Sequence, residues 1–366
     1  MNQTARMTIE SRVLIRTSHH GLGTDGPLSL SDLLPPTLTA RLEGLDVKSR
    51  RVFAGKLQGE RRSKRRGRSV EFDDFRPYVA GDDLRHIDWN VYARLDRFFI
   101  KLFQAEEDLT VHVVLDASAS MLAGAPAKLI AAARLCSALS YAALVNNNRL
   151  LVSAIGLPTA ESAAAVGPTA TGDGGVARSE PLRGRAAVQR ALSFLLSAAQ
   201  AAAEAPLNQG RATDFAAGLR TIAAARAGRG IMVIVSDLLI PGGTKGEPGY
   251  APGLRYVAGS EAYETFVFQV LAPGELDPAA EAAAGSSSSR SPLWGDLRLL
   301  DAETGSAREV TVTADLIKRY RTAAARFVEG TATWCRGRGI EHTLVTSDLD
   351  PATGVVDALR KVGVLA

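Results

Sequence analysis

The sequence predicts an α/β protein, in which a mostly parallel β-sheet carries helices on both faces and is preceded by a small β-containing module. Two observations predict this class. From residue 109 onward, strand-like and helix-like segments alternate along the 366-residue chain. The first of these strands, residues 111–115 (Val-His-Val-Val-Leu), is almost wholly apolar, which is typical of a central strand covered on both faces.

The front of the chain divides into two parts. Residues 1–45 are polar, weakly periodic and interrupted by Pro35-Pro36, and they predict a loosely ordered tail followed by a short helix over 37–45. Residues 46–108 predict the small module, with a basic run between Arg61 and Arg68 and a strand over 97–104. We expect this strand to pair with the strand over 109–116.

Residues 109–366 predict the α/β domain. After the strand at 109–116, further strands are expected at 149–155, 231–236, 263–271 and 340–346. Helices are expected at 128–145, 186–203, 215–226, 313–337 and 351–362. A hairpin is expected over 297–312, and two low-complexity segments near 158–180 and 277–291 predict flexible surface insertions.

The composition excludes several classes of protein. The 43 Lys and Arg residues against 39 Asp and Glu leave a net charge of +4, too small to make the whole molecule a nucleic-acid binder. Cys136 and Cys335 are too few for a disulfide framework or a four-thiolate zinc site, and we expect both to be small buried residues. The five scattered histidines form no zinc-hydrolase pattern.

The sequence also predicts where the protein resides. No apolar run reaches the ~18 residues that a membrane span needs, and the N-terminus lacks the apolar region of a signal peptide. We therefore expect a cytoplasmic protein without a transmembrane segment. Peripheral association with a membrane through a partner stays open.

A group of oxygen-bearing side chains follows the predicted strands. The strand at 111–115 ends in Asp116, Ser118 and Ser120, spaced as D-x-S-x-S, and the strand at 231–236 ends in Asp237. In an open α/β sheet, ligands bind outside the carboxyl ends of the strands. Together with Thr213, which begins a later helix, these hard oxygen donors suit Mg²⁺, and Mn²⁺ or Ca²⁺ as alternatives. The competing interpretation is that the serines only cap the next helix and that Asp237 is a turn residue.

At these positions the sequence resembles the von Willebrand factor type A-like fold, a Rossmann-like arrangement, and its metal-ion-dependent adhesion site. The resemblance implies that Asp116, Ser118, Ser120, Thr213 and Asp237 bind a divalent metal. It also implies that an acidic side chain of a protein partner completes the coordination, and that the site binds rather than catalyses. The chain departs from the family at Leu238, because a glycine often follows this aspartate.

A second resemblance rests on residues 71–94, EFDDFRPYVAGDDLRHIDWNVYAR. This segment resembles the signature of a widespread bacterial family of uncharacterised proteins, domain-of-unknown-function family fifty-eight, in which it precedes a type A-like domain. Members are commonly encoded beside MoxR-type AAA+ ATPases, so the resemblance implies such an ATPase as the partner. Many members carry N-terminal membrane helices, and we expect this chain to lack them.

The signature alternates arginines with aspartates. Arg–Asp pairs can lock a loop through bidentate hydrogen bonds, and the aromatic residues can pack that loop. We expect a structural clamp between the small module and the α/β domain, with a partner-docking face as the alternative. The residues concerned are Arg76, Asp82, Asp83, Arg85, Asp88, Trp89 and Arg94.

We therefore predict a protein-binding adaptor or scaffold that depends on a divalent metal and acts with a MoxR-type ATPase in protein assembly or maturation. One alternative is a metal-dependent phosphoester hydrolase, although no general base stands out and His112 is expected to be a packed core residue. The other alternative is binding of nucleic acid or an anionic surface through the basic run Arg61–Arg68, which no recognised nucleic-acid motif accompanies. We do not expect an enzyme or a nucleic-acid binder.

Overall fold

The computed structural model describes residues 28–49, 72–79, 82–103, 109–124, 126–157, 166, 175–204, 214–225, 228–242, 246–258, 262–279, 295–300 and 307–366. The chain forms two compact units. Residues 52–108 form the smaller unit, and the remainder forms the larger unit. The boundary at residue 52 lies close to the start of the expected module at residue 46.

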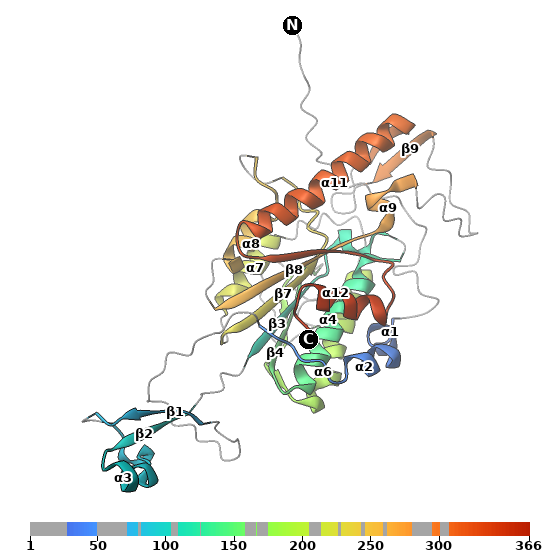
Figure 1. The fold of residues 1–366 in the computed structure, drawn as a ribbon. Coiled ribbons are helices and arrows are strands. Elements are labelled where there is room, and N and C mark those ends of the chain that lie inside the picture. Colours follow the sequence, from blue (N-terminus) through green and yellow to red (C-terminus); the bar gives the residue numbers. More distant parts are fainter. Residues whose placement is uncertain are drawn as a thin grey trace. The chain divides into compact units, whose positions relative to one another are not determined.

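The larger unit is built on a mostly parallel sheet (Figure 1). Its parallel strands are β3 (Thr110–Asp116), β4 (Arg149–Ile155), β7 (Gly230–Ser236), β8 (Tyr263–Leu271) and β11 (Glu341–Thr346). They lie in the order β11-β8-β7-β3-β4, so the chain leaves the central strand β3 toward β4 and later returns to its other side with β7. The predicted α/β class with a mostly parallel sheet is confirmed.

Two short antiparallel strands extend the sheet beside β4. They are β5 (Ala177–Arg178) and β6 (Leu182–Arg183). Residues 175–180 belong to the segment expected to be a flexible surface insertion, and for these residues that expectation is wrong. Val176 and Ala177 are fully buried in the two cores. Strand β5 pairs with β4 and so covers the edge that β4 would otherwise leave unpaired.

Helices cover both faces of the sheet, as Figure 1 shows. One face carries α4 (Lys128–Val145), α6 (Val188–Glu204) and α12 (Thr353–Lys361), and the other carries α7 (Phe215–Ala224), α8 (Ala251–Ala258) and α11 (Ala314–Arg336). Side chains of β3 alternate between these layers, with Val113 and Leu115 in the first core and Val114 in the second. Cys136 and Cys335 are buried in these cores, as expected.

Helix α4 is central to the first layer. Among the described residues it is the one helix whose length and apolar composition would allow it to cross a membrane, with a mean hydropathy of 1.4. Within the protein, 89% of it is buried. That burial accounts for the apolar sequence, because a helix enclosed on all sides has no face that needs polar residues.

The segment before the basic run packs onto the same layer. Helices α1 (Leu30–Leu33) and α2 (Pro36–Leu42) bury Leu33, Leu38 and Leu42 almost completely. The chain then pairs with the C-terminus through the bridge Val47–Leu365. The short helix expected over 37–45 corresponds to α2. Residues 28–34 differ from the loosely ordered tail that we expected, because Leu33 helps to complete the core over α4.

The smaller unit contains an antiparallel pair, β1 (Phe72–Pro77) with β2 (Phe99–Phe103), and the helix α3 (Trp89–Leu95). The expected pairing of the strand at 97–104 with the strand at 109–116 is wrong. Both edges of β3 are occupied by β4 and β7, so β3 has no edge to offer β2.

The last part of the chain contains the expected hairpin, formed by β9 (Gly295–Leu300) and β10 (Ala307–Val312). Between β8 and this hairpin lies a one-turn helix, α9 (Pro273–Leu276), which the sequence analysis did not predict. Residues 280–291 of the second expected insertion lie outside the described part of the chain.

Candidate metal centre

The ends of two adjacent parallel strands define the candidate site. Asp116 is the last residue of β3, and Asp237 follows the last residue of β7. The connection that leaves β3 runs through α4 on one face of the sheet, and the connection that leaves β7 runs through α8 on the other face, so the strand order reverses between these two strands. Open α/β sheets bind ligands in the crevice at such a point, because the connections diverge there and leave the strand ends accessible.

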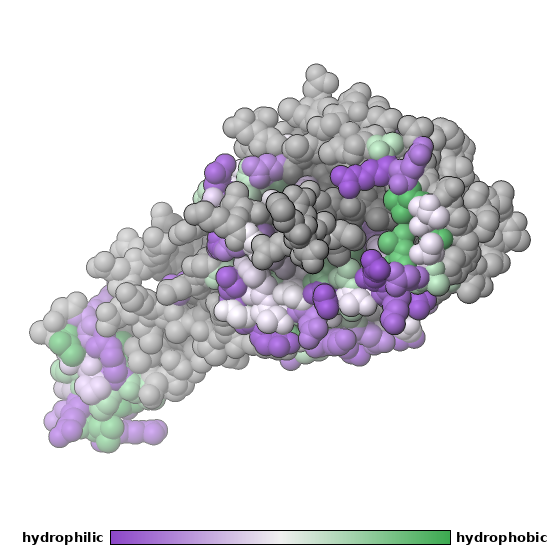
Figure 2. Space-filling model, turned by 90° about the horizontal axis from the view of Figure 1, so that it is seen from above, coloured by the Kyte–Doolittle hydropathy of each residue, from purple (hydrophilic) through white to green (hydrophobic). Residues whose placement is uncertain are grey.

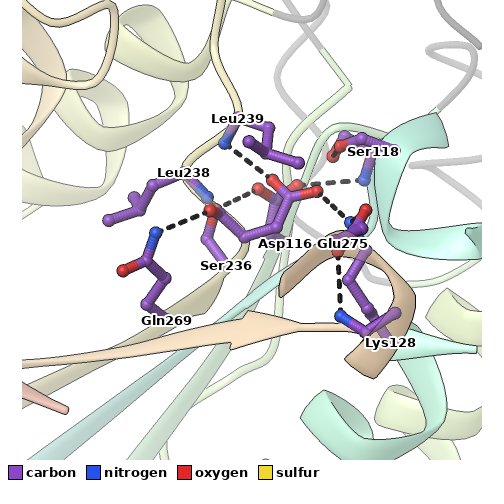
Figure 3. A network of polar contacts seen from close by, with 11 residues as sticks. Asp116, Ser118, Lys128, Ser236, Leu238, Leu239, Gln269 and Glu275 are labelled. Carbon is purple, nitrogen blue, oxygen red and sulfur yellow. Dashed lines mark hydrogen bonds and ion pairs between the residues drawn. The ribbon is translucent and has the colours of Figure 1, made fainter. Parts of the chain in front are cut away.

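The carboxylate of Asp116 is held by two donors. The backbone N–H of Ser118 donates to Oδ1 at 3.0 Å, and the hydroxyl of Ser236 donates to Oδ2 at 2.6 Å (Figure 3). Ser236 in turn accepts from the backbone N–H of Leu238 at 3.0 Å. Asp116 is 3% exposed, so its position is determined by buried hydrogen bonds and not by solvent.

The two serines of the D-x-S-x-S turn face each other. The Oγ atoms of Ser118 and Ser120 are 3.1 Å apart, and both residues are buried. Ser118 occupies the N-cap position of the short 3₁₀ helix Ala119–Leu122 but makes no side-chain capping hydrogen bond. The interpretation of Ser118 as a helix cap is therefore wrong, and its hydroxyl is directed to Ser120 instead.

Gly156, directly after β4, makes room for this turn. Its φ is +80°, and a Cβ placed on it would lie 2.7 Å from the backbone N of Ser118 and 3.1 Å from Oδ1 of Asp116. Such contacts are too short for a side chain, so only glycine fits against the turn here.

Asp237 is paired with a lysine that the sequence analysis missed. The Nζ atom of Lys128, at the start of α4, lies 2.8 Å from Oδ2 of Asp237 and 2.5 Å from Oε1 of Glu275 on α9 (Figure 3). The lysine side chain is 0% exposed. Asp237 also accepts from the backbone N–H of Leu239 at 3.0 Å, as a turn aspartate does.

A signal for Lys128 is present in the sequence. It is a cation at the N-terminal end of an apolar helix, where the helix dipole disfavours positive charge, so it needs acidic partners. Glu275 comes four residues after the end of β8 and therefore lies at the same edge of the sheet as Asp237. No spacing rule identifies it as the partner of Lys128.

The charges of this cluster influence one another. Burial, and then the neighbouring carboxylate of Asp237, raise the pKa of Asp116 to about 6. Burial alone would raise the pKa of Asp237, but the charge and hydrogen bond of Lys128, together with hydrogen bonds from the Leu239 N–H and from Ser120, hold that pKa below its ordinary value. Burial raises the pKa of Glu275, and the Lys128 ammonium opposes this rise.

The backbone after Asp237 adopts the conformation that glycine favours. Leu238 has a φ of +57°, in the left-handed region, and its side chain is buried. The amide of Gln269 on β8 donates to the carbonyl oxygen of Asp237 at 3.3 Å, and Nε2 of His342 lies 3.0 Å from Oε1 of the same glutamine. Leu238 therefore occupies a backbone conformation that favours glycine, at a conformational cost, while its side chain gains burial.

Thr213, the fifth predicted ligand, lies outside the described residues. Its neighbour Asp214 caps α7 by accepting from the backbone N–H of Ala217 at 2.9 Å. The structure thus brings together Asp116, Ser118, Ser120 and Asp237 from the ends of two strands.

The chemistry of these donors fits a hard divalent cation. Two carboxylates and two hydroxyls gather in a buried position, and oxygen ligands are the ones that Mg²⁺ and Mn²⁺ prefer. Two carboxylates, those of Asp237 and Glu275, contact the Lys128 ammonium, and the Asp116 carboxylate lies near Asp237, so carboxylates outnumber the single ammonium in this cluster. Within the described ranges, no three His, Cys, Asp or Glu side chains converge as ligands of one ion, so hydroxyls would have to supply part of the coordination.

The predicted clamp residues lie in the smaller unit. Arg76 donates to both carboxylate oxygens of Asp82 at 2.7 Å each, and Asp82 also accepts from the backbone N–H of Val79 at 2.9 Å. These bidentate bonds lower the pKa of Asp82. The loop from β1 is therefore locked by the kind of pair that the sequence predicted.

The other signature residues have different roles. Asp88 is the N-cap of α3 and accepts from the backbone N–H groups of Asn90 and Val91. Asp83 accepts from the backbone N–H of Arg85 at 3.0 Å. Trp89 and Arg94 are exposed on α3.

Figure 2 shows hydrophobic and hydrophilic residues mixed on the surface of the smaller unit, at its left. An aromatic group surrounds Phe98, which stacks on Tyr92 with ring centroids 4.4 Å apart and meets Trp89 edge-on at 6.4 Å. Of the seven large hydrophobic side chains that are exposed in the described part of the chain, six belong to this unit: Phe75, Val79, Leu84, Trp89, Leu95 and Phe98.

Comparison with known proteins gives relatives over nearly the whole chain. The uncharacterized proteins Mb1516 of Mycobacterium bovis and Rv1480 of Mycobacterium tuberculosis are each 27% identical over 339 residues, which cover 92% of this chain and 93% of theirs. A solved structure, an aerotolerance-related membrane protein from Bacteroides fragilis, matches with a TM-score of 0.34 and 17% identity, over 69% of this chain and 98% of that one.

The family comparison matches residues 74–329, which include most of the signature, β3, both strand-end aspartates and Lys128. This range covers well over half of the chain. The protein therefore belongs to the family described as protein of unknown function DUF58.

Proposed function

We propose that the larger unit is a von Willebrand factor type A-like domain that binds a protein partner through a divalent cation, Mg²⁺ or Mn²⁺. Asp116, Ser118, Ser120 and Asp237 would hold the cation, with Thr213 as the further ligand that the family resemblance implies. The cation would supply a positive centre at the rim of the sheet, to which a carboxylate of the partner binds.

The observation that carries this proposal is the convergence of these four side chains where the strand order reverses. The hydroxyls of Ser118 and Ser120 lie 3.1 Å apart, and Ser118 does not cap the helix that follows it. A hydrogen bond joins Ser120 to Asp237, which links the β3 turn to the end of β7. Buried charges need counter-charges, and the carboxylates of Asp116, Asp237 and Glu275 outnumber the single ammonium of Lys128.

The partner class comes from the family resemblance, which implies a MoxR-type AAA+ ATPase and a role in protein assembly or maturation. The test is affinity capture with the full chain and a purified MoxR-type ATPase, in Mg²⁺ and in EDTA. We expect capture in Mg²⁺ only, and loss of capture with Asp116→Ala. Asp315→Ala, which removes an exposed aspartate on α11, is the matched control and should capture normally.

Equal capture by the Asp116→Ala variant, in Mg²⁺ and in EDTA alike, would show that no cation bridges the two proteins. Phosphoester hydrolysis and binding through Arg61–Arg68 remain alternative predictions, and the basic run lies outside the described residues. Mg²⁺-dependent turnover of a phosphoester that Asp116→Ala abolishes would favour the hydrolase instead.

A further inference from the structure

The Lys128 ammonium has two carboxylate partners, which come from different elements. Its Nζ lies 2.8 Å from Asp237 at the end of β7 and 2.5 Å from Glu275 on α9. Its own side chain is fully buried, while the side chains of Asp237 and Glu275 are 2% and 16% exposed. The lysine therefore lies deeper than Glu275 and depends on these two groups for its charge.

Both carboxylate oxygens of Asp237 are occupied. Oδ1 accepts from the backbone N–H of Leu239, and Oδ2 accepts from Lys128. A cation that binds Asp237 must therefore compete with the ammonium. If Asp237 were the sole partner of Lys128, this competition would leave a buried ammonium without a counter-charge, which is strongly unfavourable.

Glu275 is held in place without the help of Lys128. Its Oε2 accepts from the backbone N–H of Ala272 at 2.8 Å, and its carbonyl oxygen accepts from the hydroxyl of Tyr320 on α11 at 2.9 Å. Pro273 at the first turn of α9 further restricts the backbone beside it. The carboxylate is thus preorganised to keep the ammonium when Asp237 is engaged elsewhere.

We propose that Glu275 is the alternative partner that retains Lys128 when Asp237 binds a cation, so that Lys128 and Glu275 together set the affinity of the site for the cation. The second clause, that Lys128 and Glu275 set the affinity for the cation, rests on the proposed function. Glu275 and Lys128 are positioning residues here, because they act on the cation through Asp237.

The first clause is tested without any metal, by urea unfolding of the full chain in EDTA. Asp237→Asn and Glu275→Gln should each lower the free energy of unfolding. The double variant should lose much more free energy of unfolding than the sum of the two single losses, since Lys128 then has no carboxylate partner. If the double variant does not fold, adding Lys128→Met should restore folding. Additive losses, or a triple variant that also fails to fold, would overturn the proposal.

The second clause, on the affinity for the cation, is tested by calorimetric titration of the protein with Mn²⁺ alone. We expect Glu275→Gln to bind Mn²⁺ at least tenfold more weakly than the unsubstituted protein, and Lys128→Met to bind it more tightly. In the Lys128→Met background, Glu275→Gln should have little further effect, whereas a plain loss of negative charge would weaken binding in both backgrounds. Glu247→Gln, which removes an exposed glutamate paired with Arg255, is the control.

The outcomes separate this inference from the proposed function. A non-additive unfolding cycle without any Mn²⁺ binding would overturn the cation-dependent function and leave Glu275 as the shared partner of Lys128. Mn²⁺ binding that Glu275→Gln does not weaken would overturn the inference and leave the cation site standing.

Discussion

The Nζ of Lys128 lies 2.8 Å from Oδ2 of Asp237, so the buried cation of the first-layer helix neutralises the carboxylate at the end of β7. This pair connects the core to the rim of the sheet. It determines which carboxylate of the cluster keeps a low pKa: Asp237 is held below its ordinary value, whereas the pKa of Asp116 rises to about 6. The two aspartates of the candidate metal centre are therefore not equivalent.

At Leu238, substitution by glycine should destabilise the protein less than substitution by alanine, the reverse of the usual order. Its side chain is buried, so Leu238→Ala should lower the free energy of unfolding by about 2–5 kcal/mol. Because its φ is +57°, Leu238→Gly should be less destabilising than Leu238→Ala, by about 1 kcal/mol. Urea unfolding measures the difference.

The control for this order is Leu254, which is fully buried in the helix α8. There, Leu254→Gly should be more destabilising than Leu254→Ala by about 1 kcal/mol, as in an ordinary helix. If glycine is the worse replacement at both positions, the left-handed backbone at Leu238 is not a source of strain.

Gly156→Ala should displace the D-x-S-x-S turn. The new Cβ would lie 2.7 Å from the backbone N of Ser118, so the turn must move away. We expect weaker Mn²⁺ binding in calorimetry and a loss of stability. Gly44→Ala is the matched control, because Gly44 has a similar φ of +85° but a Cβ added there would meet no atom within 4 Å. A loss of Mn²⁺ affinity of the same size in both variants would contradict the steric explanation.

His112 should make the stability fall in mild acid. Burial, and then the charge of Arg178, lower the pKa of this histidine to about 3. Between its unfolded pKa of about 6.5 and this value, the unfolded chain holds a proton that the folded protein excludes, so the free energy of unfolding should decrease as the pH falls, by about 1.4 kcal/mol per pH unit. Above pH 7 the contribution should be constant.

The measurement is urea unfolding between pH 7.5 and 4.5 for the protein and for His112→Gln. In the variant, the free energy of unfolding should fall less steeply as the pH decreases, because the proton that His112 takes up on unfolding is missing. Nε2 of His112 contacts Ser153 at 3.1 Å, and glutamine can keep a polar atom near that hydroxyl. Parallel curves for the two proteins would mean that His112 does not titrate on unfolding in this range.

Asp82→Asn should loosen the loop that follows β1. The substitution weakens the bidentate pair with Arg76 and the hydrogen bond from the backbone N–H of Val79. We expect faster hydrogen exchange at the Val79 amide, with unchanged exchange in β3 of the larger unit. Asp83→Asn is the matched control, because the Asp83 carboxylate lies 3.9 Å from the Arg85 guanidinium and both side chains are exposed. Equal exchange at Val79 in both variants would argue against a lock by Arg76 and Asp82.

The strand and helix limits in the larger unit follow closely from local pattern. The predicted segments 128–145, 149–155 and 263–271 coincide with α4, β4 and β8. The partner of β2 could not be predicted in this way, because pairing depends on which strand edges are free, and β3 has none. For the same reason, local pattern does not distinguish the buried strand β5 from a surface insertion.

By itself, the sequence determined the alternation of strands and helices and placed Asp116, Ser118, Ser120 and Asp237 at strand ends, because these depend on residue periodicity and on the residues that follow each strand. Only the tertiary structure decided that Lys128 and Glu275 lie beside Asp237. Lys128 precedes Asp237 by 109 positions in the sequence, and Glu275 follows it by 38. The physical reason is that a buried charge must find its counter-charge in space, and that choice depends on how strands and helices pack, which no local pattern records.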